Sequence, residues 1–416
     1  MPVDRATPDF SVVLDKKNFD LTTFFSVVLL TLTGFMAIYS ATYAANMNPR
    51  FEQQLSFAGI GFVIMMIAAF IPTRWYQAMA YPFYGVCLGL LILVAFKGKL
   101  VYGHRSWLAI GTLQFQPSEL TKLATIFAIG KYLNDDRDMT SIRDLALVAI
   151  MLVLPIGLVM LEPDPGSALI FAGLAVGLIL WSGADMFLLA AVCLPALVGV
   201  LSLFGWIPTM ASVLASGLII FFIFRRNLVF TIVLYSAVIG VAFSTNFVYE
   251  HLHEYQRNRI EVLLDPELDP LGAGYNVIQT RMAIGSGGLY GKGYLKGTQT
   301  QLRYVPKQWT DFIISVPSEE FGFIGAIIIL MLYLFVIFRG VAIASSVRSN
   351  FSSVVAIGIA AIWFMHVTVN IGMALGLMPV VGIPLPFMSY GGSALLTNML
   401  MAGLLMNLYR NRRLLF

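Results

Sequence analysis

Charged residues are scarce in this sequence. Only 12% of its 416 residues are Asp, Glu, Lys or Arg, which is about half the fraction that is typical of a soluble domain. Hydrophobic residues make up 58% and gather in long runs. The composition therefore excludes an ordinary soluble enzyme and indicates an all-α, polytopic membrane protein. We expect membrane lipids among its partners and no nucleic acid.

Cysteine is almost absent, and no linker-like segment interrupts the chain. Cys87 and Cys193 both lie in apolar runs, so we expect small core residues rather than a disulfide or a metal site. Residues 1–20 are polar, and the apolar run after them is long enough to remain in a membrane, which argues against a cleavable signal peptide. We expect one transmembrane domain at 21–409, with short tails at 1–20 and 410–416.

Long hydrophobic runs provide the candidate transmembrane helices. A helix needs roughly 20 apolar residues to cross the hydrocarbon core, and about twelve runs reach or approach that length. They lie at 21–43, 53–71, 79–96, 118–133, 145–161, 167–182, 186–206, 209–224, 228–248, 312–338, 351–376 and 392–409. A single large polar excursion, at 249–311, separates two of these runs.

The distribution of Lys and Arg predicts the orientation. If the N-terminus is cytoplasmic and the spans alternate, most basic residues fall inside: Arg5, Lys16, Lys17, Arg74, Lys131, Arg137, Arg143, Arg225, Arg226, Arg339, Arg348, Arg410, Arg412 and Arg413. The short external segments hold few: Arg50, Lys97, Lys99 and Arg105. We therefore expect both termini in the cytoplasm and the loop at 249–311 outside.

The first segment with expected chemistry precedes the fourth run. The Pro-Ser pair at 117–118 is typical of a helix start, which places Glu119 and Lys122 on one helix face. The pair either neutralises itself to fix helix packing or forms the charged wall of a polar cavity, where intramembrane charges usually lie. Arg105 and Trp107 are either interfacial anchors or ligands of an anionic headgroup.

Two further segments interrupt the apolar pattern on the same expected side. Glu162 and Asp164 share a tight turn; its Pro and Gly account for the turn itself but not for two acids. A structural role and a ligand role for Asp164 both remain open. Pro and Gly also break the helical pattern at Met378–Ser393, where irregular backbone is tolerated only when it is buried in protein or lines a cavity.

The long external loop ends in the strongest catalytic candidate. Asp311 stands directly before an apolar run, where a carboxylate is costly and marks a functional candidate. The alternative is a helix cap, which stabilises by about 1 kcal/mol. We expect Glu319 and Glu320 in the first turns of that span. The Gly-rich stretch at 285–297 lacks the G-x-x-x-x-G-K-[ST] pattern and is no phosphate-binding P-loop.

Together these segments resemble the SEDS family (shape, elongation, division and sporulation) of bacterial cell-wall proteins. The longest match is DPLGAGYNVIQTRMAIGSGGLYGKGYLKGTQTQL at 269–302, and its sequence is most similar to the RodA branch of the family. The other matching motifs are QPSELTKL at 116–123, PDPG at 163–166, TDFI at 310–313, EEFG at 319–322 and PLPFMSYGGS at 384–393. The resemblance covers the chain from about Leu21 to Arg413.

The resemblance implies a peptidoglycan glycosyltransferase that polymerises lipid II into glycan strands on the outer face of the bacterial cytoplasmic membrane during elongation. It implies a class B penicillin-binding protein, a transpeptidase, as partner within the elongation machinery. It also implies that Asp311 is the catalytic carboxylate. The substrate-binding candidates are Arg105, Trp107, Glu119, Lys122, Asp164, Gln299, Gln308, Glu320 and Ser389.

The chain departs from the family pattern at several positions. Family members usually have about ten spans, so the runs at 186–224 read as an inserted pair that preserves the topology. Trp309 stands where the family commonly has His before Thr-Asp-Phe, and His104 where Ala is usual. A histidine relay beside Asp311 is therefore not expected in this chain.

A mechanism follows as a hypothesis. Asp311 is either the general base for the sugar hydroxyl or a ligand of a divalent cation such as Mg²⁺ or Mn²⁺. Lys122 and Arg105 would hold the pyrophosphate, Glu119 would orient Lys122, and the Gly-rich loop would allow close backbone approach to the substrate. The rival hypotheses are a lipid II flippase or other transporter, and a non-catalytic scaffold for the penicillin-binding protein.

Overall fold

The computed structural model describes most of the 416-residue chain. The described residues are 19–43, 48–101, 104–110, 113–134, 142–183, 186–224, 227–251, 257–258, 261–262 and 272–412. Within them, every apolar run that the sequence singled out falls on a helix, although not always with the expected bounds.

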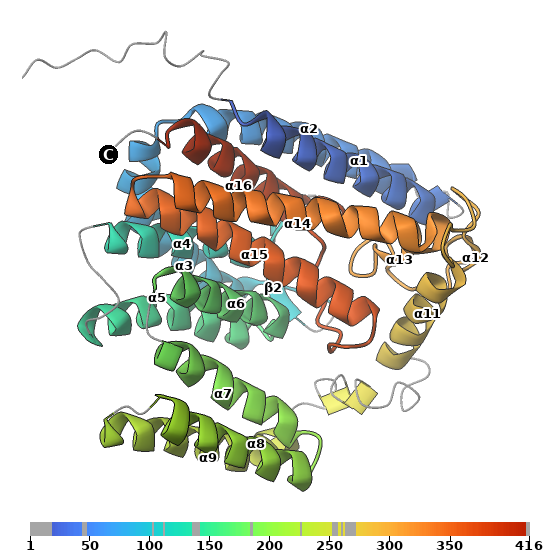
Figure 1. Ribbon diagram of the computed structural model, residues 1–416. Helices are drawn as coiled ribbons and strands as arrows, with labels where there is room; N and C mark the ends of the chain where they lie inside the picture. Colours follow the sequence, from blue (N-terminus) through green and yellow to red (C-terminus); the bar gives the residue numbers. More distant parts are fainter. Residues whose placement is uncertain are drawn as a thin grey trace, which may run out of the picture.

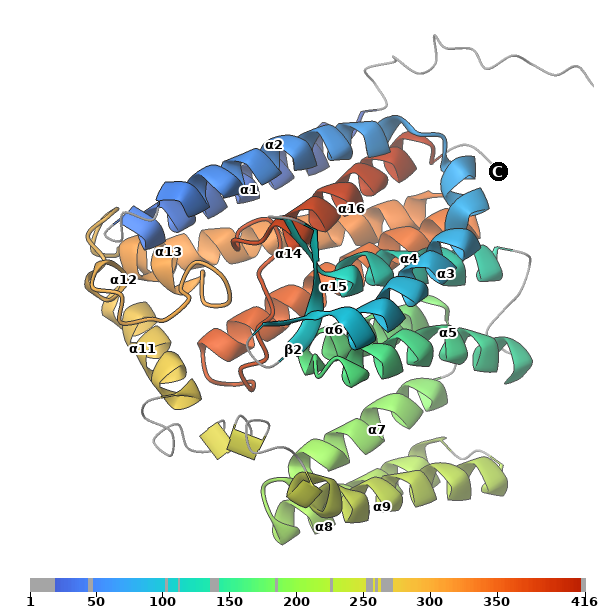
Figure 2. The ribbon, with the colours of Figure 1, turned by 180° about the vertical axis from the view of Figure 1, so that it is seen from behind.

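Long helices build the bundle (Figures 1 and 2). In the first half they are α1 (Leu21–Tyr43), α2 (Asn48–Phe70), α3 (Thr73–Lys97), α4 (Pro117–Leu133), α5 (Ile142–Leu161) and α6 (Pro165–Trp181). In the second half they are α7 (Met186–Ser202), α8 (Trp206–Leu218) with its π-helical extension η3 (Ile219–Phe224), α9 (Leu228–His251), α14 (Gly322–Ser346), α15 (Asn350–Ala374) and α16 (Gly392–Arg410).

The helices identify a multi-pass membrane protein. Among the described residues, eight helices are long and apolar enough to cross a membrane, and α6 and α7 are shorter apolar helices. The outer helices expose large apolar side chains such as Phe243, Phe222 and Phe338. Such exposure is unfavourable in water and expected against lipid, where the hydrophobic effect places no penalty on it.

The core lies where α4 and α15 meet the rest of the bundle. Nearly every residue of α4 is buried, although its composition is the most polar of the long helices before the external loop. In α15, 67% of the residues in its most apolar stretch are buried. These two helices therefore face protein on almost all sides, which allows them to carry polar side chains away from lipid.

The helices α7, α8 and α9 form a separate layer. Their buried residues make a small cluster of their own, which includes Val198, Val213 and Val238. In both views this layer lies at one edge of the molecule, and α7 packs against α6 (Figures 1 and 2). Cys193 is exposed on α7, so the expectation of a core residue is wrong there; Cys87 is buried as expected, and both thiols are free.

A small antiparallel sheet leads into α4 and was not expected from the sequence. It consists of β1 (Lys99–Val101), β2 (His104–Ile110) and β3 (Leu113–Phe115), in that order. On β2, Trp107 pairs with Lys99 of β1. The strands are too short to give an alternating pattern that stands out beside the long apolar runs.

The expected span at 312–338 is corrected by the structure. The chain first forms a short helix, α13 (Ser315–Glu320), and the long helix α14 begins only at Gly322. Gly322 has a positive φ of 67°, a conformation that glycine adopts without strain, and this residue separates the two helices. Glu319 and Glu320 therefore belong to α13 and not to the first turns of the span.

Candidate active site

Asp311 lies in a loop that two other segments hold by its backbone. The Asn370 amide on α15 donates to the carbonyl oxygen of Asp311, at 2.8 Å. The Ser389 hydroxyl donates to the carbonyl oxygen of Thr310, at 2.7 Å, and accepts from the Leu385 amide, at 2.8 Å. These hydrogen bonds to α15 and to the irregular segment fix the backbone position of Asp311.

The carboxylate of Asp311 lies against the irregular segment at 378–391. A Cβ placed on Gly382 would lie 3.6 Å from Oδ2 of Asp311, and Gly382 itself has a φ of 73°. Asp311 is partly exposed, unlike the apolar residues that follow it. The irregular backbone therefore lies directly beside this carboxylate, and whether it lines a cavity there stays a prediction.

The expected pair on α4 is confirmed and gains a third member. The ammonium group of Lys122 donates to Glu119 at 2.8 Å and to Nε2 of His366 on α15 at 2.9 Å. All three side chains are buried. Nδ1 of His366 lies 3.0 Å from the carbonyl oxygen of Pro384, which can only accept, so Nδ1 carries the proton and Nε2 accepts from Lys122.

The residues around Asp311 and the residues around Lys122 both bind to the irregular segment, at the adjacent residues Ile383 and Pro384. The amide of Asn370 that holds Asp311 also donates to the carbonyl oxygen of Ile383, at 2.7 Å. His366 bonds to the next residue, Pro384. His366 and Asn370 are four residues apart and therefore share a face of α15. Through these two side chains, α15 connects both Lys122 and Asp311 to the irregular segment. Asn370 and His366 were not anticipated; polar residues in an otherwise apolar run were the signal.

Asp164 also lies at this segment, as the cap of α6. Its carboxylate accepts from the Ser167 backbone amide at 3.0 Å and from the Gln116 side chain at 3.1 Å. The α6 terminus approaches the irregular segment so closely that a Cβ on Gly166 would lie 2.9 Å from the carbonyl oxygen of Val381. Asp164 thus has a clear structural role, and it stands near the same irregular segment as Asp311.

Glu162, in the same turn, is buried and distinct from Asp164. Neither of its carboxylate oxygens has a hydrogen-bond partner among the described residues. Burial, with a smaller contribution from the charge of Asp164, raises the pKa of Glu162 to about 8. This carboxyl is therefore protonated over much of the neutral range.

A second polar cluster surrounds Glu319. Its carboxylate accepts from the backbone amides of Gln299 and Thr300, each at 2.9 Å, and from the ammonium group of Lys292 at 2.8 Å. Burial acts to raise the pKa of Glu319, but these hydrogen bonds outweigh it and lower the pKa below its usual value. The cluster ties the long loop to α13.

Gln299, Gln308 and Glu320 belong to this second cluster. Gln308 is fully buried, and its amide donates to the carbonyl oxygens of Ala41 and Thr300, each at 3.0 Å. Glu320 accepts from the Ser40 hydroxyl on α1 and from the Leu295 amide, and burial raises its pKa. Gln308 and Glu320 connect this region to α1, whereas Gln299 binds to Glu319 on α13. A substrate role for the three residues stays a prediction.

The glycines of the loop pack against protein. A Cβ on Gly287 would lie 2.1 Å from the Ser318 carbonyl oxygen, and one on Gly291 would lie 2.1 Å from that of Glu320. No side chain fits between such backbones. The hypothesis that these glycines allow close approach of substrate is therefore corrected: at these two positions they allow the loop to lie on α13.

The remaining candidates lie on the small sheet, and Trp309 lies just before Asp311. Arg105 and Trp107 are on β2, and Trp107 is partly buried; the Arg105 side chain lies outside the described atoms. Trp309 bonds through its carbonyl oxygen to the Tyr390 amide at 2.9 Å. The Arg50 guanidinium lies 4.3 Å from the centroid of the Trp309 ring, which is a cation–π contact.

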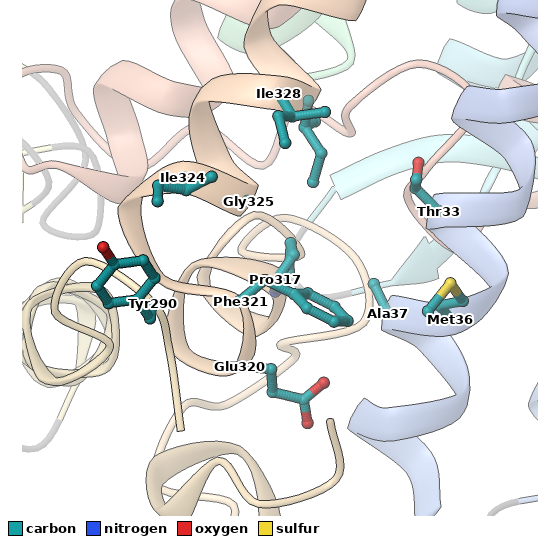
Figure 3. Close-up of a pocket in the computed structure, with 11 residues that line it drawn as sticks. Thr33, Met36, Ala37, Tyr290, Pro317, Glu320, Phe321, Ile324, Gly325 and Ile328 are labelled. Atoms are coloured by element: carbon teal, nitrogen blue, oxygen red, sulfur yellow. The ribbon is translucent and has the colours of Figure 1, made fainter. Parts of the chain in front are cut away.

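An apolar pocket of about 400 Å³ lies beside the second cluster, between α1 and α14. Thr33, Met36 and Ala37 line it from α1, and Ile324 and Ile328 line it from α14 (Figure 3). Glu320 and Tyr290 also line it, and Met36 and Ile328 are exposed on the surface of the molecule. The pocket suits a flexible hydrocarbon chain.

The described residues offer no ready cage for a metal ion. No group of three or more His, Cys, Asp or Glu side chains is arranged there to hold one. Mg²⁺ is commonly held by one or two carboxylates together with phosphates and waters, so Asp311 fits only as one ligand among several. The arrangement itself provides a partly exposed carboxylate and a buried ammonium group, both linked through α15 to Ile383 and Pro384 of the irregular segment.

This fold and site define a multi-pass membrane protein with a polar centre among its helices, and the comparisons give its family. The family model FTSW_RODA_SPOVE, described as cell cycle protein, matches residues 20–212 and 207–414. The chain belongs to this family, as its motifs predicted.

Individual relatives agree with the family match. The chain is 35% identical to the peptidoglycan glycosyltransferase MrdB of Escherichia coli, covering 98% of each chain. It is 31% identical to the peptidoglycan glycosyltransferase RodA of Treponema pallidum, covering 94% of this chain and 97% of the relative.

Solved structures share the fold. A chain from a study of how a peptidoglycan synthase complex coordinates polymerization and crosslinking matches with a TM-score of 0.72 and 30% identity, over 95% of this chain and 98% of that chain. The rod shape determining protein RodA of Thermus thermophilus matches with a TM-score of 0.64 and 26% identity, over 95% and 98%.

Proposed function

We propose that the chain is a peptidoglycan glycosyltransferase that polymerises lipid II, with Asp311 as its general base. The family match and the names of its relatives support the reaction class. The observation that carries the assignment of residues is the hydrogen-bond path from Asp311 through Asn370 to the irregular segment, and from there through His366 to Lys122.

In the proposed reaction, the Asp311 carboxylate takes the proton of the attacking sugar hydroxyl. That oxygen forms a new bond to the anomeric carbon of the donor sugar, and the bond from this carbon to the pyrophosphate oxygen breaks. The leaving group departs as undecaprenyl pyrophosphate. Lys122, a buried cation that two neighbours hold in place, binds the pyrophosphate of the bound substrate and keeps that contact as the group departs.

We also propose the membrane side of the reaction, the partner protein and the place of the lipid chain. We place the site on the outer face of the cytoplasmic membrane, with both termini inside, because of the bias of Lys and Arg. A class B penicillin-binding protein is the proposed partner, in line with the synthase complex among the structural relatives. The apolar pocket between α1 and α14 is of a size to receive part of the polyprenyl chain.

Purified protein and lipid II in detergent test the proposal. The wild-type chain is expected to form glycan strands, and Asp311→Asn to lose at least about 1,000-fold in rate, since the base is removed while the side-chain shape is kept. Glu261→Gln is the matched control, because it neutralises a carboxylate of the same external loop that pairs with Arg257 and Tyr249.

Each rival function has a distinct outcome in this experiment. The buried pair on α4 is also what a transporter would carry, but a transporter forms no glycan in detergent. A non-catalytic scaffold likewise forms no glycan there, with or without Asp311→Asn, and its function in cells would survive that substitution. Polymerisation that survives this substitution would overturn the catalytic assignment.

A further inference from the structure

We propose that His366 and Asn370 are positioning residues that set the geometry between Lys122 and Asp311. The proposal rests on the glycosyltransferase function proposed above and deepens it. The two side chains stand one helical turn apart on α15, and both are buried. Each bonds on one side to a functional candidate and on the other to the same irregular segment.

His366 fixes the direction of the Lys122 ammonium group. An ammonium group has three N–H donors; one reaches Glu119 and a second reaches Nε2 of His366. The third is left for a ligand. The Pro384 carbonyl oxygen holds the histidine in the tautomer that can accept from Lys122. Without His366, the long lysine side chain would regain rotamer freedom around a single partner.

Asn370 fixes Asp311 in an equivalent way. Its amide nitrogen donates to the carbonyl oxygens of Asp311 and Ile383, at 2.8 and 2.7 Å. Because both bonds come from one amide group, the loop that carries Asp311 and the irregular segment keep a constant spacing. Since reacting groups must be held close to their productive geometry, a small shift here is costly for rate.

The two residues therefore predict different kinetic defects. His366→Phe keeps the ring and removes both hydrogen bonds, so KM for lipid II is expected to rise about 10-fold through the weaker hold on the pyrophosphate. Asn370→Ala is expected to lower kcat about 100-fold, because the base is displaced. His366→Gln, which keeps a donor and an acceptor, is expected to recover part of the loss.

Trp363→Phe is the matched control on the same helix. Trp363 is buried and donates to Asn398 at 2.8 Å, so the variant loses one buried hydrogen bond of α15 without touching Lys122 or Asp311. It is expected to keep KM and kcat within about 2-fold. Similar kinetic losses in Trp363→Phe would show a general weakening of α15 and overturn the positioning role.

A double-mutant cycle on lipid II binding completes the test. If His366 acts through Lys122, His366→Phe weakens binding in the wild type but adds less than about 2-fold in a Lys122→Met background. Full additivity overturns the proposal for His366, and an unchanged kcat in Asn370→Ala overturns it for Asn370. A wild-type chain that makes no glycan would instead overturn the proposed function, and this inference with it.

Discussion

Two carboxylate-centred clusters lie at the same side of the bundle, and their surroundings differ. Glu319 is fully buried and accepts hydrogen bonds from two backbone amides and a lysine. Asp311 is partly exposed, and Asn370 and Ser389 donate to the backbone carbonyl oxygens of Asp311 and Thr310. The Glu319 carboxylate is thus a buried anchor of the loop, whereas the Asp311 carboxylate is partly exposed on a backbone that its neighbours hold.

The two clusters also stabilise different parts of the molecule. The Glu319 cluster fastens a long loop with little core of its own, so its loss should unfold that loop. The Asp311 cluster lies between helices that pack without it. Substitutions in the first should lower stability and activity together, and substitutions in the second should lower activity alone.

The largest expected loss of stability comes from Glu319→Leu. The change removes the acceptor of the Gln299 and Thr300 amides and one of the acceptors of the Lys292 ammonium group, which keeps Ser286 and Thr298. Leaving amide donors unsatisfied in a buried site costs about 1–3 kcal/mol each. Scanning fluorimetry of the purified protein should show a clearly lower Tm and a parallel loss of glycan synthesis. If activity fell at unchanged Tm, Glu319 would belong with the chemical carboxylates and the comparison would fail.

Gly291→Ala should have a smaller effect of the same kind. Gly291 has a φ of 80°, and a Cβ there would meet the backbone of Glu320. The strained backbone costs about 1–3 kcal/mol, besides the displacement of α13. Gly285→Ala is the control, because its Cβ meets nothing within 4 Å. The Tm of the first variant should fall below that of the second; equal values would contradict the packing role of the loop glycines.

The sequence predicted the helices and the pair of Glu119 with Lys122, because both follow from local spacing. It misplaced the start of α14, because residues 312–314 are apolar for another reason. Phe312 and Ile313 are buried against protein, and hydropathy cannot distinguish that burial from contact with lipid. The polar character of His366 in an apolar run was visible, but its partners could not be predicted, because they lie 244 and 18 residues away.

Ser389→Ala should affect the Asp311 cluster alone. The variant loses the hydroxyl that bridges Thr310 and Leu385, so the loop before Asp311 is held less firmly. We expect a fall in kcat of about 10-fold and little change in Tm. Ser345→Ala is the control, since that exposed hydroxyl bonds only within α14. A fall in Tm as large as that of Gly291→Ala would show that the two clusters are not separable.

Glu162 is a third kind of carboxyl, because it is buried and has no hydrogen-bond donor among the described residues. Its effect on stability should depend on pH. Its pKa in the folded protein is about 8, above the ordinary value of 4.5, so the folded state binds more protons than the unfolded state between these pH values. Its contribution to stability therefore falls as pH rises from about 5 to 8 and is constant above that range. Glu162→Gln stays neutral, so its Tm relative to the wild type should rise across the same interval. A Tm difference that is the same at pH 5 and pH 9 would mean that Glu162 is ionised or partnered in the folded protein.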